Sequence, residues 1–133
     1  MIYMLDTDTF SYLVKDAHPV KQAALKIDPD QIKISVVTQA EVWFGMQLRT
    51  VAAHTQARIS ELLEGFEVLP LDSAVAASYA LVRARLHKTG TLIGPNDLWI
   101  AAHALSREMT LVTNNTREFK RVPGLKLENW VGT

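Results

Sequence analysis

Cysteine is absent from this chain of 133 residues, and long hydrophobic runs are absent as well. The lack of cysteine excludes disulfide bonds, thiolate metal sites and a cysteine nucleophile. No apolar segment approaches the roughly 18 residues that a membrane-spanning helix requires, and no basic segment precedes an apolar one at the start. We therefore expect a protein that stays in the cytoplasm and does not enter a membrane.

Neither sign of charge is in excess, since 14 Lys and Arg residues balance 14 Asp and Glu residues. The net charge therefore gives no reason to expect nucleic-acid binding, and any attraction to RNA has to be local or depend on cations. The four histidines are scattered without a His-Glu-x-x-His motif, and the phosphate-binding glycine motifs are missing. Zinc sites and nucleotide cofactors are not expected.

Hydrophobic residues make up 48% of the chain, enough to bury a core without cross-links, and we expect one domain over residues 1–133. Short apolar runs predict strands at residues 2–5, 32–36, 68–71, 111–113 and 125–127. Helical or amphipathic spacing fills the intervals, through about residue 15 and at 19–27, 38–48, 52–64, 73–88 and 97–108. This alternation predicts an α/β fold, with a parallel β-sheet of about five strands sandwiched between helices. Ligands bind such sheets beyond the carboxyl ends of the strands.

The first strand is followed by Asp6-Thr-Asp8-Thr. An acid after a buried strand can point into the crevice above the sheet, but Asp is also a frequent helix N-cap residue. Both interpretations of Asp6 stay open. Asp8 lies further from the end of the strand, which favours a capping or supporting role in the first helical turn.

Glu41 follows the second strand and has two interpretations. Thr38-x-x-Glu41 matches a capping box, in which the Glu side chain reaches back to the cap residue. The same spacing puts Glu41 on the predicted inward stripe of Val37, Ala40, Phe44 and Leu48, and a buried carboxylate needs a cation or a polar network. We favour the functional interpretation, and expect Trp43 and Phe44 in a core or an interface.

Asp97 follows Gly94-Pro-Asn and begins another predicted helix, where an acid also complements the helix dipole. Together, Asp6, Glu41 and Asp97 lie near first helical turns of one parallel scaffold, so we expect them to converge at one edge of the sheet. Converging carboxylates repel unless a divalent cation neutralises them, and hard oxygen ligands favour Mg²⁺ or Mn²⁺. The chemistry that follows is phosphodiester hydrolysis by a metal-activated water.

Four motifs in order resemble the PIN-domain toxins of bacterial type II toxin–antitoxin modules, the VapC family. They are Met-Leu-Asp6-Thr-Asp, Thr38-x-x-Glu41-x-x-x-Gly45, Gly94-Pro-Asn-Asp97-x-x-Ile-Ala-Ala102 and Leu111-Val-Thr-Asn-Asn115-x-x-Glu-Phe119. The third and fourth resemble the enteric-type members most, whose usual substrate is initiator tRNA, cut in the anticodon stem-loop. The resemblance covers nearly the whole chain.

This resemblance implies a metal-dependent endoribonuclease in which Asp6, Glu41 and Asp97 are catalytic and hold the Mg²⁺ or Mn²⁺. It implies in-line attack by water, products with 5′-phosphate and 3′-hydroxyl ends, and a homodimer. It also implies a VapB-type antitoxin, whose C-terminal segment wraps the toxin and blocks the acidic site, commonly with an inserted Arg.

One position departs from the family pattern, because many members have a fourth acid where this chain has Asn115. An amide accepts a hydrogen bond from a metal-bound water but adds no charge, so we expect a weaker second metal site. Glu118 is a candidate to compensate, or else a surface acid, and Thr113 is a candidate to orient a carboxylate or water.

Two other functions are compatible with parts of this pattern. A phospho-receiver domain would use Asp72 as phosphoacceptor, but the required Lys is missing after the fourth strand, where Asn114-Asn115-Thr116 stands. A catalytically silent PIN-like module would bind RNA or a partner without cutting. The RNA surface itself is not determined by the sequence; six cations are candidates, Arg83, Arg85, Lys88, Arg117, Lys120 and Arg121, the first three also suited to a helix C-terminus.

Overall fold

The computed structural model describes residues 1–132, and its centre is a sheet of five parallel strands in the order β3-β2-β1-β4-β5. The strands are β1 (Tyr3–Leu5), β2 (Ile32–Ser35), β3 (Glu67–Leu69), β4 (Thr110–Val112) and β5 (Leu127–Glu128). They are short and largely apolar, as expected for strands covered on both faces. The α/β class and the parallel sheet predicted from the sequence are confirmed.

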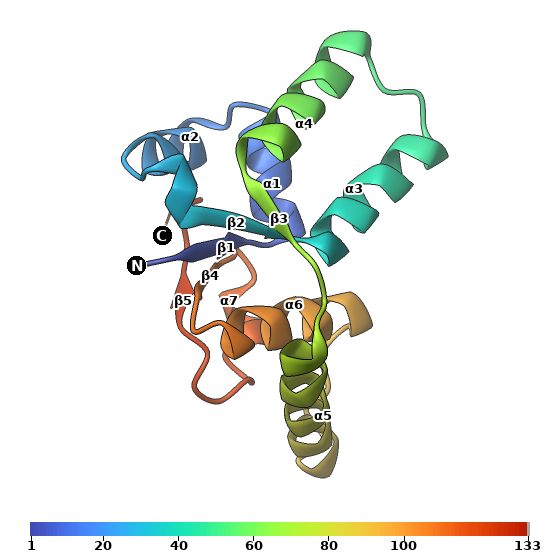
Figure 1. Cartoon of the computed structure of the whole chain (residues 1–133), viewed down its shortest axis with the longest axis vertical. Helices are drawn as coiled ribbons and strands as arrows, with labels where there is room; N and C mark the ends of the chain where they lie inside the picture. The colour runs from blue at the N-terminus through green and yellow to red at the C-terminus, as the bar shows by residue number, and fades with distance from the viewer. Residues whose placement is uncertain (133) are drawn as a thin grey trace.

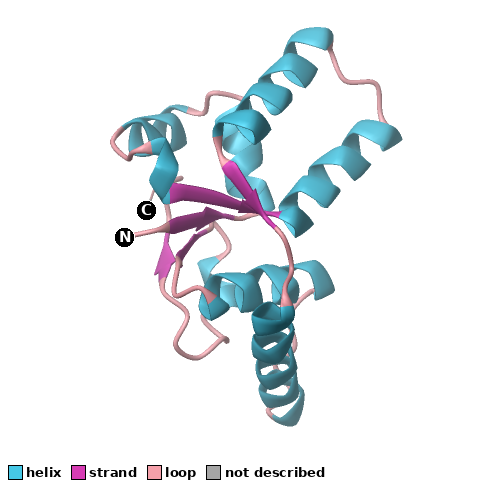
Figure 2. Ribbon diagram, viewed as in Figure 1, coloured by secondary structure: helices cyan, strands magenta, loops and turns pink. Residues whose placement is uncertain are grey.

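Helices cover both faces of the sheet (Figures 1 and 2). On one side lie α1 (Thr7–Val14), α2 (His18–Leu25), α3 (Val36–Leu48) and α4 (Ala53–Gly65), with the 3-10 turn η1 (Pro29–Gln31) leading into β2. On the other lie α5 (Ser73–Lys88), α6 (Pro95–Ser106) and the short α7 (Thr116–Phe119). Each side has its own core, with Phe10 and Leu13 of α1 packed on one face of the sheet and Ile100 and Ala104 of α6 on the other.

Several boundaries differ from the predicted ones for identifiable reasons. The helix α3 begins at Val36 because Ser35 caps it, its hydroxyl accepting from the Val37 N–H at 3.1 Å. The same hydroxyl lies 2.8 Å from Nδ1 of the fully buried His103, which ties this cap to α6. The helix α6 begins two residues before Asp97, with Pro95 at its first position. The single turn α7 was not predicted, because four residues are too few to show a period.

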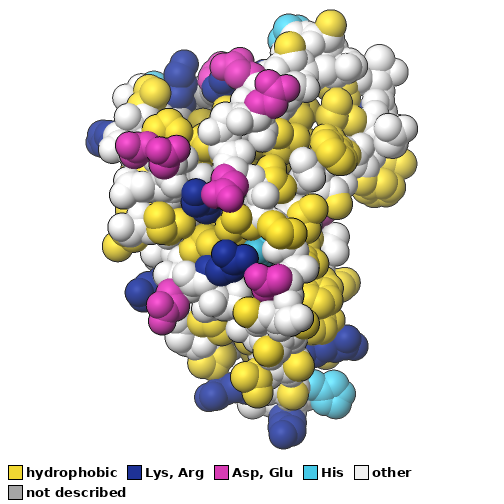
Figure 3. Space-filling model, in the orientation of Figure 1, with side chains coloured by type: hydrophobic (Ala, Val, Ile, Leu, Met, Phe, Trp, Pro, Cys, Tyr) yellow, Lys and Arg dark blue, Asp and Glu magenta, His cyan; other side chains and the backbone are white. Residues whose placement is uncertain are grey.

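The predicted inward stripe of α3 was wrong except at Val37. Its buried residues are Val37 and Thr38, whereas Trp43, Phe44 and Leu48 are 53%, 62% and 65% exposed. The helix leaves the edge of the sheet and projects beside α4, so one side of it faces no other part of the chain (Figure 1). Hydrophobic side chains gather at that edge of the surface (Figure 3). Trp43 and Phe44 therefore lie outside the core.

The strand order fixes where a ligand site is expected. From β1 the chain runs to β2 and β3 on one side, then returns to β4 and β5 on the other. The order thus reverses between β1 and β4, and the crevice beyond the carboxyl ends of two such strands is the usual binding place in an open α/β sheet. Asp6 follows β1, and Thr113 follows β4.

Candidate active site

A polar pocket of about 210 Å³ lies at this reversal point. Six residues from four separate parts of the chain line it, Asp6, Thr7, Asp8, Glu41, Asp97 and Asn115. Four of the six are acids, and they approach one another only in the fold. The structure therefore brings together the three acids singled out in the sequence, and adds Asp8, Asn115 and Thr7 to their surroundings.

Asp6 is both a helix cap and a pocket residue, so the two interpretations of the sequence do not exclude each other. Its carboxylate accepts from the Thr9 N–H at 2.9 Å, which caps α1, and it is only 4% exposed. Burial raises its pKa, while hydrogen bonds from the Thr113 side chain and from Thr9 oppose that rise. The cap and the Thr113 contact hold the carboxylate at the tip of β1.

Glu41 does not form the capping box that its spacing with Thr38 suggested, because the cap of α3 is Ser35. Its carboxylate instead accepts a hydrogen bond from the hydroxyl of Thr7, at the start of α1. The Thr7 hydroxyl also lies 3.4 Å from that of Thr38. Thr7 was missed in the sequence, where a single Thr between two acids gives no signal of a contact 34 residues away.

Asp97 lies in the first turn of α6, where burial and the neighbouring acids raise its pKa. Its pKa rises to about 7, first because of burial and then because of the negative charges of Glu118, Asp6, Glu41 and Asp8. A proton at neutral pH is one way to relieve this repulsion, and a bound cation is the other. The pocket thus favours a positive charge.

Asn115 and Glu118 form a small network at the rim of the pocket. The Asn115 side-chain amide donates to one Glu118 carboxylate oxygen at 2.6 Å, and the Gly94 N–H donates to the other at 3.0 Å. The Asn115 N–H donates to the Thr113 hydroxyl at 2.9 Å. Thr113 is fully buried and contacts Asp6 as well, so it connects the end of β4 to the carboxylate after β1.

The donor set suits a hard divalent cation, because carboxylate, hydroxyl and amide oxygens are the ligands that Mg²⁺ and Mn²⁺ favour. The side chains do not form a closed cage: within residues 1–132, no three Asp, Glu or His groups are close enough to make a ready metal cluster. Mg²⁺ commonly binds through one or two carboxylates and keeps several waters. Acids that do not enclose the cation are compatible with this mode of Mg²⁺ binding.

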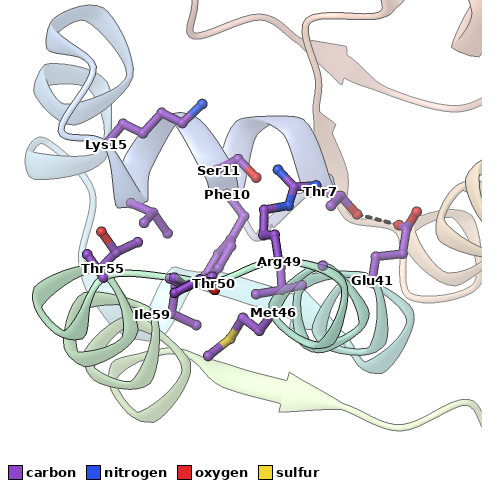
Figure 4. Close-up of a pocket in the computed structure, with 15 residues that line it drawn as sticks. Thr7, Phe10, Ser11, Lys15, Glu41, Met46, Arg49, Thr50, Thr55 and Ile59 are labelled. Carbon is purple, nitrogen blue, oxygen red and sulfur yellow. Dashed lines mark hydrogen bonds between the residues drawn. The ribbon is translucent and has the colours of Figure 1, made fainter.

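A second, larger hollow of about 470 Å³ adjoins the acids and shares Thr7 and Glu41 with them. It runs between α1, α3 and α4 (Figure 4). Its walls combine apolar side chains, Phe10, Val14, Val42, Met46, Val51 and Ile59 among them, with Lys15 and Arg49. We call it the α1–α4 groove. An apolar lining of this kind can accept the apolar face of an amphipathic helix.

The six cations considered for RNA contact are all exposed and form none of the ion pairs within residues 1–132. Two of the six form hydrogen bonds within the chain: Arg83 donates to the Tyr79 hydroxyl at 3.0 Å, and Arg121 donates to the Leu92 carbonyl at 3.1 Å. Asp72, the alternative phosphoacceptor, caps α5 and pairs with Arg107 at 2.9 Å. It has a structural role away from the acidic pocket.

The family model for the PIN domain matches residues 3–125, so the chain has the fold of the PIN-domain class of nucleases. The chain is 37% identical to ribonuclease VapC2 of Rickettsia felis, over 98% of both chains. It is 34% identical to the tRNA(fMet)-specific endonuclease VapC of Salmonella typhimurium, over 96% of this chain and 97% of that one. The chain therefore belongs to the VapC family of PIN-domain ribonucleases.

Solved structures agree with this assignment. The chain superposes with a TM-score of 0.91 and 35% identity on a chain of VapBC2 from Rickettsia felis bound to a promoter DNA fragment, covering 98% of this chain and 99% of that one. It superposes with a TM-score of 0.90 and 33% identity on a chain of DNA-bound VapBC from Salmonella typhimurium, covering 98% of each. Nucleases of the PIN class generally depend on a divalent metal.

Proposed function

We propose that this chain is the toxin of a type II toxin–antitoxin module and cleaves initiator tRNA in its anticodon stem-loop. The observation that carries the proposal is the convergence of Asp6, Glu41 and Asp97 in one polar pocket at the reversal point of the sheet. The family assignment supports ribonuclease activity, and the name of the Salmonella typhimurium relative supports the choice of tRNA.

In this proposal Asp6, Glu41 and Asp97 are the catalytic residues and hold Mg²⁺ or Mn²⁺. The cation, when bound, supplies an acidified water and neutralises charge on the scissile phosphate. The chain fixes the carboxylates by separate contacts: Thr9 and Thr113 hold Asp6, and Thr7 holds Glu41. Asp8 and Asn115 are auxiliary residues on the pocket wall, and Thr113 and Glu118 are auxiliary residues that accept hydrogen bonds from Asn115.

A VapB-type antitoxin is the proposed partner, since related VapC chains are solved as VapBC complexes. We propose that the C-terminal segment of the antitoxin binds in the α1–α4 groove. The groove is largely apolar, its walls include Lys15 and Arg49, and it reaches Glu41 of the acidic pocket. Arg49 extends from the end of α3 toward α1 in this groove (Figure 4). A basic side chain of the antitoxin entering at the Glu41 end would satisfy the acids and block the RNA.

Two further parts of the proposal concern assembly and location. We propose a homodimer, and the unpartnered apolar side of α3 is surface of the kind that stable dimers cover. We propose a cytoplasmic location, where tRNA is found. None of the helices within residues 1–132 has the length and hydrophobicity that would let it span a membrane.

The decisive experiment incubates the purified chain with total tRNA and Mg²⁺ or Mn²⁺, with and without EDTA, and maps the cut ends. We expect cleavage of initiator tRNA that leaves 5′-phosphate and 3′-hydroxyl ends and stops with EDTA. Asp6→Asn and Asp97→Asn should abolish cleavage and keep the fold, as judged by circular dichroism. Undiminished cleavage by well-folded Asp6→Asn would disprove the site assignment.

A catalytically silent PIN-like module is the second candidate. It would bind the same tRNA with or without EDTA and release no fragments. Retention of the three acids in one pocket, with Asp97 at a pKa of about 7, favours the enzyme, because a module that only binds RNA gains nothing from acids that repel phosphate.

A further inference from the structure

A buried histidine outside the acidic pocket joins the helices that carry two of the three acids. His103 lies in the third turn of α6, six residues after Asp97, and is fully buried. Its ring nitrogen Nδ1 lies 2.8 Å from the hydroxyl of Ser35, which caps α3 six residues before Glu41. Six residues of helix span about 9 Å along the axis. The contact is therefore remote from both carboxylates but belongs to the same two helices.

The hydrogen-bond partners of the two side chains indicate which one donates. Burial, followed by the charge of Arg107, lowers the pKa of His103, so its ring is neutral at pH 7 and carries one proton. The other ring nitrogen, Nε2, is buried and makes no hydrogen bond within residues 1–132. With the proton on Nε2, the Ser35 hydroxyl donates to Nδ1 and accepts from the Val37 N–H. With the proton on Nδ1, the hydroxyl would accept twice and its own proton would be unpaired, so the structure favours Ser35 as the donor.

The helix α3 has few other contacts that fix its direction. Its buried residues are Val37 and Thr38, and the remainder projects from the edge of the sheet (Figure 1). Among the described residues, no other side-chain hydrogen bond connects Ser35 or α3 to α6. A helix anchored at one end turns about that end, so a small rotation at Ser35 displaces the side chains of the second turn. Glu41 lies in that turn.

We propose that His103 is a positioning residue: through Ser35 it holds the start of α3 against α6 and thereby sets the distance between the carboxylates of Glu41 and Asp97. His103 forms no hydrogen bond with either acid within residues 1–132, so it acts only through Ser35. The inference rests on the metal-dependent cleavage proposed above. Displacing a catalytic group by about 1 Å can lower a rate by about a hundredfold, which makes this distance important.

Two substitutions of similar size at position 103 separate positioning from packing. Asn and Leu have nearly the same shape and are both smaller than His, so each leaves a similar cavity. The Asn amide has a polar atom near the place of Nδ1 and can keep the hydrogen bond with Ser35, whereas Leu cannot. His103→Asn buries two unpaired amide N–H groups, and His103→Leu leaves only the Ser35 hydroxyl proton unpaired. His103→Leu should therefore be at least as stable as His103→Asn, so stability and positioning predict opposite orders of activity.

The first measurement is tRNA cleavage at saturating Mg²⁺, with kcat and KM determined separately. We expect His103→Leu to lower kcat about tenfold or more and to leave KM within about twofold, because RNA binding does not depend on the spacing of the acids. His103→Asn should stay within about threefold of the starting kcat. Ile100→Val, at a fully buried residue of the same helix, is the control for a small loss of packing and should keep full activity.

The second measurement is Mn²⁺ binding to the full chain without RNA, followed by electron paramagnetic resonance of free Mn²⁺. The affinities should fall in the same order, with His103→Leu weaker than His103→Asn. Urea denaturation of each variant gives the free energy of unfolding, against which the order of activity and of affinity is compared.

A double-mutant cycle tests whether His103 acts through Ser35. Ser35→Ala removes the hydroxyl and the cap of α3, whereas Ser35→Thr keeps both and should keep activity. Because the two residues share one hydrogen bond, Ser35→Ala combined with His103→Leu should lose no more activity than Ser35→Ala alone. If Ser35→Ala does not fold, the comparison of His103→Asn with His103→Leu still decides.

Two outcomes overturn the inference while the proposed function survives. If His103→Leu cuts tRNA and binds Mn²⁺ as well as His103→Asn, the hydrogen bond does not position the acids. If the losses of Ser35→Ala and His103→Leu multiply in the double variant, His103 does not act through Ser35. A starting protein that neither binds Mn²⁺ nor cuts tRNA overturns the proposed function, and the inference with it.

Discussion

The Thr7 hydroxyl donates a hydrogen bond to the Glu41 carboxylate, which joins the first turn of α1 to the second turn of α3. The two residues lie 34 positions apart in the chain and share both the acidic pocket and the α1–α4 groove. The contact therefore connects the residues proposed to cut RNA with the surface proposed to bind an inhibitor. A change in the groove that moves Thr7 would also move Glu41.

Removing this hydroxyl should impair the site without unfolding the chain. In Thr7→Val the Glu41 carboxylate loses its donor, and a hydrogen bond to a charged group contributes about 1.5–3 kcal/mol. We expect a fall of about tenfold or more in the rate of tRNA cleavage, measured at saturating Mg²⁺. Thr7→Ser keeps the hydroxyl and should restore activity, and Thr55→Val, in the part of the groove formed by α4, should have no effect. Equal activity of Thr7→Val and Thr7→Ser would remove Thr7 from the site.

Asp97 should make the metal-free protein less stable as the pH rises. Its pKa is about 7 in the folded chain, against an ordinary value of 3.8, so between these pH values the folded state holds a proton that the unfolded state has lost. The free energy of unfolding therefore falls from about pH 4 to about pH 7 through this group. Asp97→Asn should remove that fall and add about 1–2 kcal/mol of stability at about pH 8 in EDTA, a figure reduced for the partial exposure of the side chain.

Urea denaturation at a series of pH values measures this effect. Added Mg²⁺ should then stabilise the starting protein at about pH 8 and leave Asp97→Asn unchanged, because a ligand stabilises only the state that binds it. Asp30→Asn, at an exposed acid in η1, is the control and should not alter the pH dependence. If the free energy of unfolding depended on pH in the same way in the starting protein and in Asp97→Asn, the pocket would not raise the pKa of this carboxylate.

The groove gives a prediction that separates inhibition from catalysis. Met46 lines the α1–α4 groove from α3, whereas the next residue, Gln47, is exposed and outside it. Met46→Asp places a charge where an apolar antitoxin segment would pack, and should weaken antitoxin binding by about a hundredfold or more. Cleavage of tRNA by the free toxin should persist, and Gln47→Asp should bind the antitoxin normally. Calorimetric titration with the cognate antitoxin measures the binding of both variants; normal binding by Met46→Asp would place the partner elsewhere.

The sequence predicted the fold and the three acids because those features have local signals. A strand followed by an acid, such as Leu5 before Asp6, is visible in a few residues, and the ordered motifs added the family. What it did not predict depends on contacts between distant segments. The Thr7–Glu41 hydrogen bond and the contact of Glu118 with Gly94 each need the folded chain. Thr38-x-x-Glu41 suggested a cap that Ser35 already provides.

The exposure of one side of α3 could not be predicted from the sequence either. Phe44 and Leu48 have helical spacing, and spacing alone cannot distinguish a face that packs inside the chain from one left for a partner. The sheet ends before it reaches this part of α3 (Figure 1), and the two side chains stay exposed.

Charge is unevenly distributed although the total is zero, and this predicts where RNA binds. Residues 73–96 contain Arg83, Arg85 and Lys88 and not one carboxylate, and Lys and Arg side chains gather at the end of the molecule where α5 ends (Figure 3). The chain then turns directly into the Gly94 cap of α6, which carries Asp97. Phosphates held along this end would lead the RNA strand toward the acids.

The salt dependence of tRNA binding tests that path. In an Asp97→Asn background, which keeps the RNA uncut, Arg83→Gln with Arg85→Gln should lower the slope of log affinity against log salt by about 0.7–0.9 for each lost phosphate contact. Lys26→Gln, at the exposed end of α2, removes a charge elsewhere and should leave the slope unchanged. An unchanged slope in the double variant would exclude Arg83 and Arg85 from the RNA surface. The remaining cations to exchange would then be Lys88 at the end of α5, Arg117 in α7, and Lys120 and Arg121 after it. Because counterion release counts phosphates rather than bases, this measurement locates the surface without knowledge of the RNA sequence.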